Sequence, residues 1–326
     1  MTIRDKEMTK RVKRQQQVHL GPLNVGVTLP ARQAEVVRNS IPYKYVIKPA
    51  LKRLSGSNGH ARNGAGAYRA GFPAEKPRAP INAPTSPEAQ AIIEKISGYD
   101  WYHTIELPHG VVTPGYVDHR EQLDYYNLPA DMTGMRVLDV ATFDGFWAFE
   151  FERRGAEVVA IDLASTSDID TPRNWGDVVE EKGVKLAKGE GFRIASELRG
   201  SKVRKEICSV YDVNPDRFGM FDMVFCSDLL IHLRDPLHAM ESIWSVTRNF
   251  AIFGDVYHPD LEAFKDNALV EFCQAGQTDV WWRPSTTCYK LWLHLARFAR
   301  VEEQSRFVLE SNFRSEIPKV VFHAFR

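Results

Sequence analysis

The stretch MRVLDVATFDGFWAFEFERRGAEVVAID, residues 135–162, predicts a strand, a tight turn, a helix and a second strand. Residues 135–140 are mostly apolar and β-branched, as in a buried parallel strand, and residues 158–161 repeat that pattern. Between them, residues 146–154 suit a helix that ends at Gly155 after two arginines. The stretch therefore predicts a βαβ unit, which binds nucleotide-like ligands at the carboxyl ends of its strands.

An acidic residue stands near the end of each of these two strands. Asp139 lies near the end of the first, and Asp162 closes the second. A carboxylate in the second position can accept hydrogen bonds from both hydroxyls of a ribose. We therefore expect Asp162 to hold the sugar of a nucleotide-like ligand.

This arrangement resembles the first two motifs of the class I methyltransferases, which use S-adenosyl-L-methionine (SAM). The resemblance extends over about residues 98–326 and is closest to the branch that includes the tRNA wobble-uridine carboxymethyltransferases. It implies an α/β, Rossmann-like fold with a seven-stranded, mostly parallel sheet and an antiparallel C-terminal hairpin. It also implies SAM as the cofactor and methyl transfer as the activity, with no metal.

The turn after the first strand departs from the family pattern. The family usually has glycines where this chain has Ala141 and Phe143, and only Gly145 remains of the usual three. We expect a remodelled pocket, with the Phe143 ring over the cofactor or at the pocket mouth. Thr142 and Asp144 are then expected to face the amino-acid end of SAM, whose α-amino group pairs with Asp139 or Asp144. The lost glycines also leave open a non-catalytic relative.

Two further motifs follow along the chain. Residues 207–210 predict the third strand, after which the resemblance implies an acid that accepts a hydrogen bond from the adenine amino group. Asp212 matches that acid, and Tyr211 can cover the ring. Residues 223–226 predict the fourth strand, whose carboxyl end directs Ser227, Asp228 and Leu229 toward the cofactor.

The heptapeptide LIHLRDP, residues 230–236, matches a specific family pattern beyond the fourth strand. Its histidine, His232, has two interpretations. In the family this histidine often orients the loop by hydrogen bonding. Alternatively it is the general base for a hydroxyl acceptor, since the pKa of a histidine lies near the working pH.

An aromatic segment precedes the first strand. The resemblance places Trp101 and its neighbour Tyr102 near the sulfonium end of SAM, although both can equally be packing residues. Where the carboxymethyltransferases use a lysine to bind carboxy-SAM, this chain has His103. A neutral histidine lacks the fixed charge of a lysine, so we expect ordinary SAM.

The rest of the chain supplies the remaining elements. A long insertion at residues 163–206 leaves room for a loop that faces the substrate. Helices are expected at residues 86–96, 118–128, 191–198, 237–246 and 286–299, and further strands at 250–256, 300–309 and 319–325, with a long polar connection at 310–318.

Charge divides the chain into two parts. Residues 1–90 hold 16 Lys/Arg and 5 Asp/Glu (+11), which leaves 26 basic and 37 acidic residues (−11) in the remainder. We expect a basic, partly disordered extension at residues 1–85 and a methyltransferase domain at 86–326. The extension can bind RNA or a membrane surface, or fold back on its own acidic domain.

The four cysteines form no CxxC pair, no long apolar run is present, and the N-terminus lacks a secretory signal. The sequence thus predicts a cytoplasmic enzyme that methylates a hydroxyl, or another nucleophile, of a small molecule or glycan. Alternatives are a tRNA wobble-uridine-modifying (carboxy)methyltransferase that binds tRNA through the basic extension, and a non-catalytic binding module. The oligomeric state is left open.

Overall fold

The computed structural model describes residues 86–165, 168–170, 189–273, 280–311 and 316–326, together with two N-terminal strands. The chain divides into two units, Met1–Gly66 and Ala67–Arg326. In the first unit, β1 (Gln15–Leu20) pairs antiparallel with β2 (Val25–Pro30). The sequence predicts a basic, partly disordered extension here, in which residues 1–17 are disordered or a frayed helix, and this is wrong for Gln15–Gln17, which belong to β1. The overlooked signal is alternation of apolar residues, most regular in β2. The predicted boundary between residues 85 and 86 stays a prediction.

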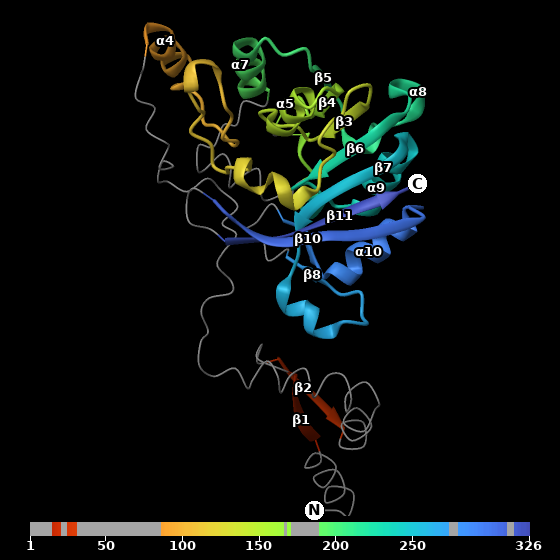
Figure 1. The fold of residues 1–326 in the computed structure, drawn as a ribbon. Coiled ribbons are helices and arrows are strands. Elements are labelled where there is room, and N and C mark those ends of the chain that lie inside the picture. Colours follow the sequence, from red (N-terminus) through yellow and green to blue (C-terminus); the bar gives the residue numbers. More distant parts are fainter. Residues whose placement is uncertain are drawn as a thin grey trace, which may run out of the picture. The chain divides into compact units, whose positions relative to one another are not determined.

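The second unit is built on a seven-stranded sheet with the order β10-β11-β7-β6-β3-β4-β5 (Figure 1). Strands β7, β6, β3, β4 and β5 are parallel, and β11 is antiparallel to both of its neighbours, β7 and β10. The predicted sheet with its antiparallel C-terminal hairpin is therefore confirmed. The strands are β3 (Arg136–Val140), β4 (Glu157–Asp162), β5 (Arg204–Ile207), β6 (Phe221–Ser227), β7 (Thr247–Val256), β10 (Arg300–Glu310) and β11 (Glu316–Phe325).

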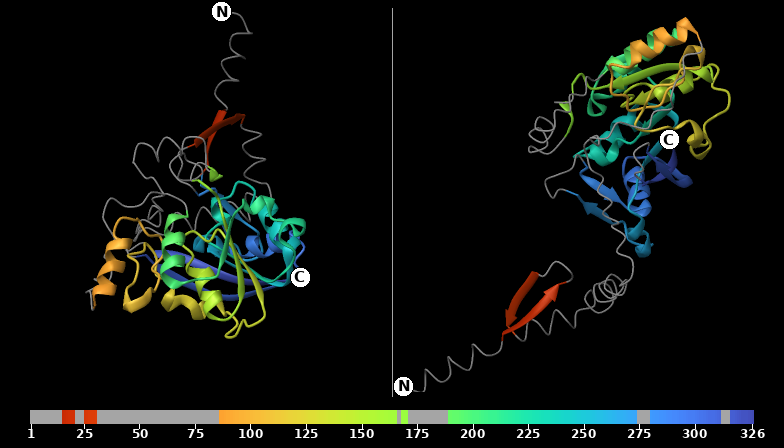
Figure 2. Two further views of the ribbon diagram at one scale, coloured as in Figure 1. Left: turned by 90° about the horizontal axis from the view of Figure 1, so that it is seen from above. Right: turned by 90° about the vertical axis from the view of Figure 1, so that its left-hand side faces the viewer.

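Helices cover both faces of this sheet. Successive residues of a strand point to opposite faces, and both faces carry apolar side chains that pack against helices. In β3, for example, Val137 belongs to one hydrophobic core and Leu138 to the other. The first core contains α4 (Pro87–Ile96), α5 (Phe146–Arg153) and α7 (Glu190–Arg199), and the second contains α8 (Pro215–Phe218), α9 (Pro236–Val246) and α10 (Thr286–Leu295). Figure 2 shows α4 beside α7, where Lys95 and Glu197 form an ion pair of 2.8 Å.

Three helices begin at N-caps whose side chains accept a backbone hydrogen bond. Ser86 accepts a hydrogen bond from the Ala89 amide, Asp235 from the His238 amide, and Ser285 from the Cys288 amide. Proline follows the first two caps at a position where its missing N–H is not needed. Each such cap stabilises its helix by about 1 kcal/mol.

Two predicted elements differ in place or kind. The third strand is β5, which ends at Ile207, whereas Val210–Asp212 forms the 3₁₀ helix η5. The apolar run at 207–210 suggests a strand, but Cys208 and Val210 are apolar because they pack into the core below that turn. The predicted helix at 118–128 is the 3₁₀ helix η3 (Arg120–Tyr126). Further short 3₁₀ helices are η2 (Pro108–Gly110), η6 (Leu230–His232) and η7 (Pro259–Phe264).

Two predicted elements near the C-terminus are longer than those in the structure. Helix α10 ends at Leu295 rather than at residue 299. The connection between β10 and β11 is shorter than residues 310–318, because Glu310 already pairs with Glu316. In the described part of the chain, no helix combines the length and apolarity that crossing a bilayer requires.

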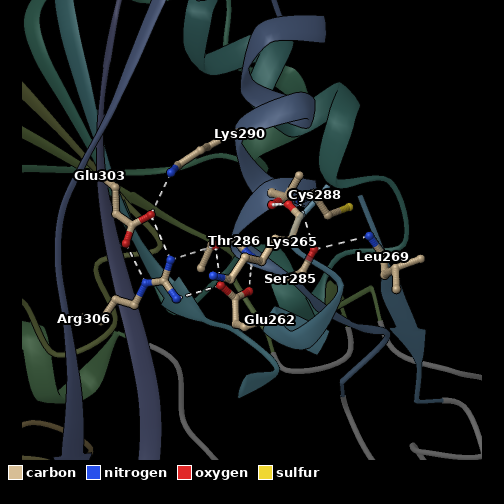
Figure 3. Close-up of polar contacts among 10 residues, drawn as sticks. Glu262, Lys265, Leu269, Ser285, Thr286, Cys288, Lys290, Glu303 and Arg306 are labelled. Atoms are coloured by element: carbon tan, nitrogen blue, oxygen red, sulfur yellow. Dashed lines mark hydrogen bonds and ion pairs between the residues drawn. The ribbon is translucent and has the colours of Figure 1, made fainter. Parts of the chain in front are cut away.

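The connection between β7 and α10 carries η7 and the antiparallel strands β8 (Val270–Phe272) and β9 (Trp282–Pro284). A polar network fastens it to the rest of the unit (Figure 3). Arg306 on β10 donates to Glu262 at 2.6 Å and to Glu303 at 2.5 Å, and Glu262 accepts from the Thr286 amide at 2.8 Å. The network, called here the Arg306 cluster, comprises Glu262, Thr286, Lys290, Glu303 and Arg306.

Candidate functional site

A cavity of about 530 Å³ lies at the carboxyl ends of the parallel strands. Its walls come from the ends of β3, β4 and β6 and from the turns that follow them and β5, as expected for a site in an open α/β sheet. Because β11 is antiparallel, its beginning reaches the same edge, where Lys319 pairs with Val256. The polar lining residues are Tyr102, His103, Asp139, Asp162, Asp168, Asp170, Ser209, Tyr211, Ser227, Asp228 and His232.

Asp162 is fixed at the end of β4. Its carboxylate accepts hydrogen bonds from the amides of Phe143, at 3.0 Å, and Leu163, at 2.7 Å. The residue is buried and lines the cavity. Since each carboxylate oxygen has two acceptor sites, the group can still accept from two hydroxyls of a ligand.

Asp139 supplies a second buried carboxylate, at the end of the neighbouring strand. It is 1% exposed, and its Oδ2 has no hydrogen-bond partner. Burial raises the pKa of Asp139 to about 7, and the nearby Asp162 adds to the rise. An unsatisfied buried acceptor on a cavity wall calls for a donor from a ligand, and a cationic N–H is the strongest such donor.

The turn between β3 and α5 keeps a backbone that glycine would favour. Ala141 has φ +61° and Phe143 has φ +49°, both in the left-handed region. Each non-glycine residue there costs about 1–2 kcal/mol, which hydrogen bonds such as that from the Thr142 amide to the Ile161 carbonyl (3.0 Å) offset. The Phe143 ring lines the cavity, with its centroid 5.0 Å from that of Tyr102.

The opposite end of the cavity is formed by the segment after β6. Ser227, Asp228, Leu229 and His232 all line it. Asp228 has φ +54°, and its amide donates to the Gly254 carbonyl at 2.9 Å. Tyr102 and His103 line the same cavity.

Residues 168–170 close part of the mouth. The Asp170 carboxylate accepts from the Tyr211 hydroxyl at 2.9 Å and from the Arg234 amide at 2.6 Å. Its backbone carbonyl accepts from the Trp281 indole at 2.5 Å. For these three residues the insertion after β4 does face the cavity, as the sequence predicts.

Comparison with known proteins finds partial relatives, and no family model matches. The ubiquinone biosynthesis O-methyltransferase of Xanthomonas oryzae pv. oryzae (strain PXO99A) is 32% identical over 115 residues, 35% of this chain and 39% of that protein. The magnesium-protoporphyrin O-methyltransferase of Rhodobacter capsulatus is 35% identical over 109 residues, 33% of this chain and 38% of that protein. Each match thus spans less than half of the relative's length.

Among solved structures, the N-terminal domain of EvdMO1, in the presence of S-adenosylhomocysteine (SAH) and D-fucose, is 15% identical. It covers 74% of this chain and 97% of that domain, with a TM-score of 0.48, too low to support an assignment. The strand order decides instead: five parallel strands, then an antiparallel strand inserted between β7 and β10. The chain has the class I methyltransferase fold.

Within this methyltransferase fold, the cavity is lined by Ala141 and by nine further residues for which the sequence predicts a place in the site. They are Tyr102, Asp139, Phe143, Asp162, Tyr211, Ser227, Asp228, Leu229 and His232. The sequence predicts the third strand at the wrong residues. Tyr211 still lines the cavity, because it lies in the 3₁₀ helix η5 that follows β5.

Five other predicted site residues do not line the cavity: Trp101, Thr142, Asp144, Gly145 and Asp212. Trp101 is buried in the first core, where its indole donates to the Ile96 carbonyl at 3.1 Å. Thr142 is buried under the turn, and Asp212 is exposed. Gly145 begins α5 with φ +98°, and a Cβ there would lie 2.7 Å from the Phe149 and Phe192 rings, so its role is packing.

Asp144 has a structural role that the sequence does not reveal. Its carboxylate accepts hydrogen bonds from the amides of Tyr102, at 2.7 Å, and His103, at 3.1 Å, and from the Tyr99 hydroxyl at 3.0 Å. It therefore holds the aromatic segment in place rather than facing the amino-acid end of a ligand. Through this anchor, Tyr102 and His103 reach the cavity wall.

The sequence assigns no site role to Ser209, Asp170 or Lys319. Ser209 lies inside the apolar run at 207–210, and Asp170 lies in the long insertion after β4, so no motif marks either of them. Lys319 does leave a signal: it is a lone cation in the apolar run PKVVFHAF, and it is fully buried. A charge in such a position requires a buried partner.

Proposed function

We propose that the chain binds SAM in this cavity and transfers its methyl group to a hydroxyl of a small molecule or glycan. One observation carries the proposal. Two carboxylates stand on neighbouring strand ends of one cavity, Asp162 fixed by two amides and Asp139 with an unsatisfied oxygen. A ribose and an ammonium group are the ligand parts that match them. The O-methyltransferase names of the partial relatives support the same function.

The residues that would hold SAM can be named from this match. Asp162 would accept from the ribose hydroxyls and Asp139 from the α-amino group. Tyr211 and Ser209 would border the adenine, in place of the predicted Asp212, and Phe143 would form a wall. SAM supplies a methyl group that its sulfonium already activates, so the chain mainly positions an acceptor.

The acceptor end offers His232 as the group that takes the hydroxyl proton. It lines the cavity at the end of η6 and is partly exposed, so it can reach a bound acceptor. The other interpretation, in which His232 only orients the loop, is favoured if His232→Gln keeps its turnover across pH.

Calorimetry with SAM tests the proposal. Asp162→Ala should weaken binding by about 1.5–3 kcal/mol, the scale of hydrogen bonds to a charged group. Asp212→Ala is the matched control, because it removes an exposed carboxylate outside the cavity and should leave the affinity unchanged. Equal affinities for wild type and Asp162→Ala would overturn the proposal.

Two alternatives have specific support. The basic extension and the family branch favour a tRNA wobble uridine as the acceptor, but among the described lining residues there is no Lys or Arg to bind phosphate. The replacement of two turn glycines by Ala141 and Phe143 favours a non-catalytic, methyltransferase-like binding module. We also infer that residues 86–326 suffice for SAM binding, because all the described lining residues lie between Tyr102 and Leu233.

A further inference from the structure

A buried group of charges stands directly behind the acceptor end of the cavity. Lys319 on β11 is 0% exposed, and its ammonium donates to Asp228 and to the Gly254 carbonyl, the latter at 3.1 Å. Asp228 lines the cavity, whereas Lys319 does not. The pair is therefore a dipole whose negative end faces the cavity.

The surroundings of this pair keep the charge on Asp228. Burial alone would raise the pKa of Asp228, but the Lys319 ammonium brings it below its usual range. Burial lowers the pKa of His119 to about 4 and that of His103 well below its usual value, so both rings are neutral near pH 7. The other titratable groups that face the pair are Tyr126, Cys226, Asp255 and Tyr289.

The position of Asp228 relates it to the methyl donor. If Asp162 and Tyr211 hold the adenosine part of SAM, the rest of the molecule extends over the ends of β3 and β6, toward Asp228. This step rests on the proposed function. The ammonium group common to SAM and SAH is assigned to Asp139, which leaves the sulfonium, present only in SAM, for the Asp228 end.

We propose that Lys319 is a positioning residue that keeps Asp228 as a fixed carboxylate at the methyl-donor end, where it favours the sulfonium of SAM over the neutral thioether of SAH. The consequence is a site that distinguishes cofactor from product by charge. Methyl transfer removes the positive charge from sulfur, so the product loses this attraction and leaves more readily.

The test is the ratio of the SAH and SAM dissociation constants, measured by calorimetry between pH 5.5 and 8. Asp228→Asn combined with Lys319→Met removes both charges, so neither member of the pair is left as an unpaired buried ion. We expect the preference for SAM over SAH to fall about tenfold in this double variant. Asp168→Asn is the matched control, because it removes a cavity carboxylate beside residues that bind Tyr211, and should leave the ratio unchanged.

Lys319→Met alone gives a second readout, the pH dependence of the preference for SAM. Replacing a lysine with a purely structural role would leave this pH dependence unchanged. Without the ammonium, Asp228 takes up a proton at higher pH. The preference for SAM should therefore persist at pH 8 and disappear toward pH 5.5. In wild type it should change less over this range, because Asp228 stays ionised and, beside the pair, burial raises the pKa of Asp255 only to about 6. Titration of Asp139 affects both ligands alike and cancels in the ratio.

Several results would overturn the inference. One is an unchanged ratio in the double variant. Another is a parallel loss of SAM and SAH, which would place Asp228 at a part of the ligand that both share. If the wild-type protein binds neither SAM nor SAH, the proposed function itself fails. If the wild-type protein binds both and the ratio of dissociation constants is the same after Asp228 is changed, only this inference fails.

Discussion

Two polar clusters of this molecule are each built around a cation from the C-terminal hairpin. Arg306 on β10 belongs to the partly exposed Arg306 cluster of Figure 3, whereas Lys319 on β11 is fully buried beside Asp228. In the Arg306 cluster, every described carboxylate is paired with donors. Around Lys319, both ring nitrogens of His119 lack a partner.

This difference distinguishes polar residues that stabilise the fold from polar residues that can bind a ligand. In the Arg306 cluster Glu262 and Glu303 each have three donors, so they have little capacity left for a ligand, and the cluster fastens the β7–α10 connection to the rest of the unit. Buried groups left without partners are uncommon in folded proteins, and each calls for an explanation. Two described residues with such groups, Asp139 and His103, line the cavity, and the ring of His119 lies 5.8 Å from that of His103 between centroids, which favours a bound ligand as the explanation at this place.

The largest expected effect comes from breaking the buried pair. Lys319→Met leaves Asp228 as an unpaired buried carboxylate, which should cost about 3–5 kcal/mol of unfolding free energy at pH 8. The double variant with Asp228→Asn should recover most of that loss. Urea denaturation measures both. If Lys319→Met lowers the unfolding free energy by less than about 1 kcal/mol, the value for an exposed ion pair, the Lys319 pair would not differ energetically from the Arg306 cluster.

Asp139 gives an intermediate effect that depends on pH. Its folded pKa of about 7 lies above the usual value near 3.9, so its contribution to stability is present below pH 4 and is lost as the pH rises through 7. Asp139→Asn should therefore stabilise the ligand-free protein by about 1–3 kcal/mol at pH 8 and weaken SAM binding. Thermal unfolding of both proteins from pH 4.5 to 8 checks this, and parallel curves would contradict it.

The smallest effect is expected at the Arg306 cluster. Arg306→Ala should cost about 1 kcal/mol of stability, because the side chain is partly exposed and water replaces its partners. SAM affinity should stay at the wild-type value, since none of the cluster lines the cavity. A loss of SAM binding in this variant would show that the β7–α10 connection positions the site, and the two clusters would no longer differ in role.

The sequence predicts the sheet well because strands β3, β4, β6 and β7 are apolar runs, and Ser86, Asp235 and Ser285 are caps with a local mechanism. It also points to residues that line the cavity at or just after strand ends, such as Asp162 and Asp228. It misassigns Asp144 and Trp101, since neither their spacing nor their type shows which side of the turn they face. Lys319 becomes relevant only through the antiparallel pairing of β11, a contact distant in sequence.

The most direct test of SAM binding compares three ligands in one thermal-shift experiment on the full chain. The account predicts that SAM and SAH each raise the melting temperature, because Asp162 and Asp139 bind parts that both ligands share. NAD should leave it unchanged, since the turn lacks the glycine pattern G-x-G-x-x-G that binds a pyrophosphate. No shift with SAM or SAH, or a larger shift with NAD, would contradict the account.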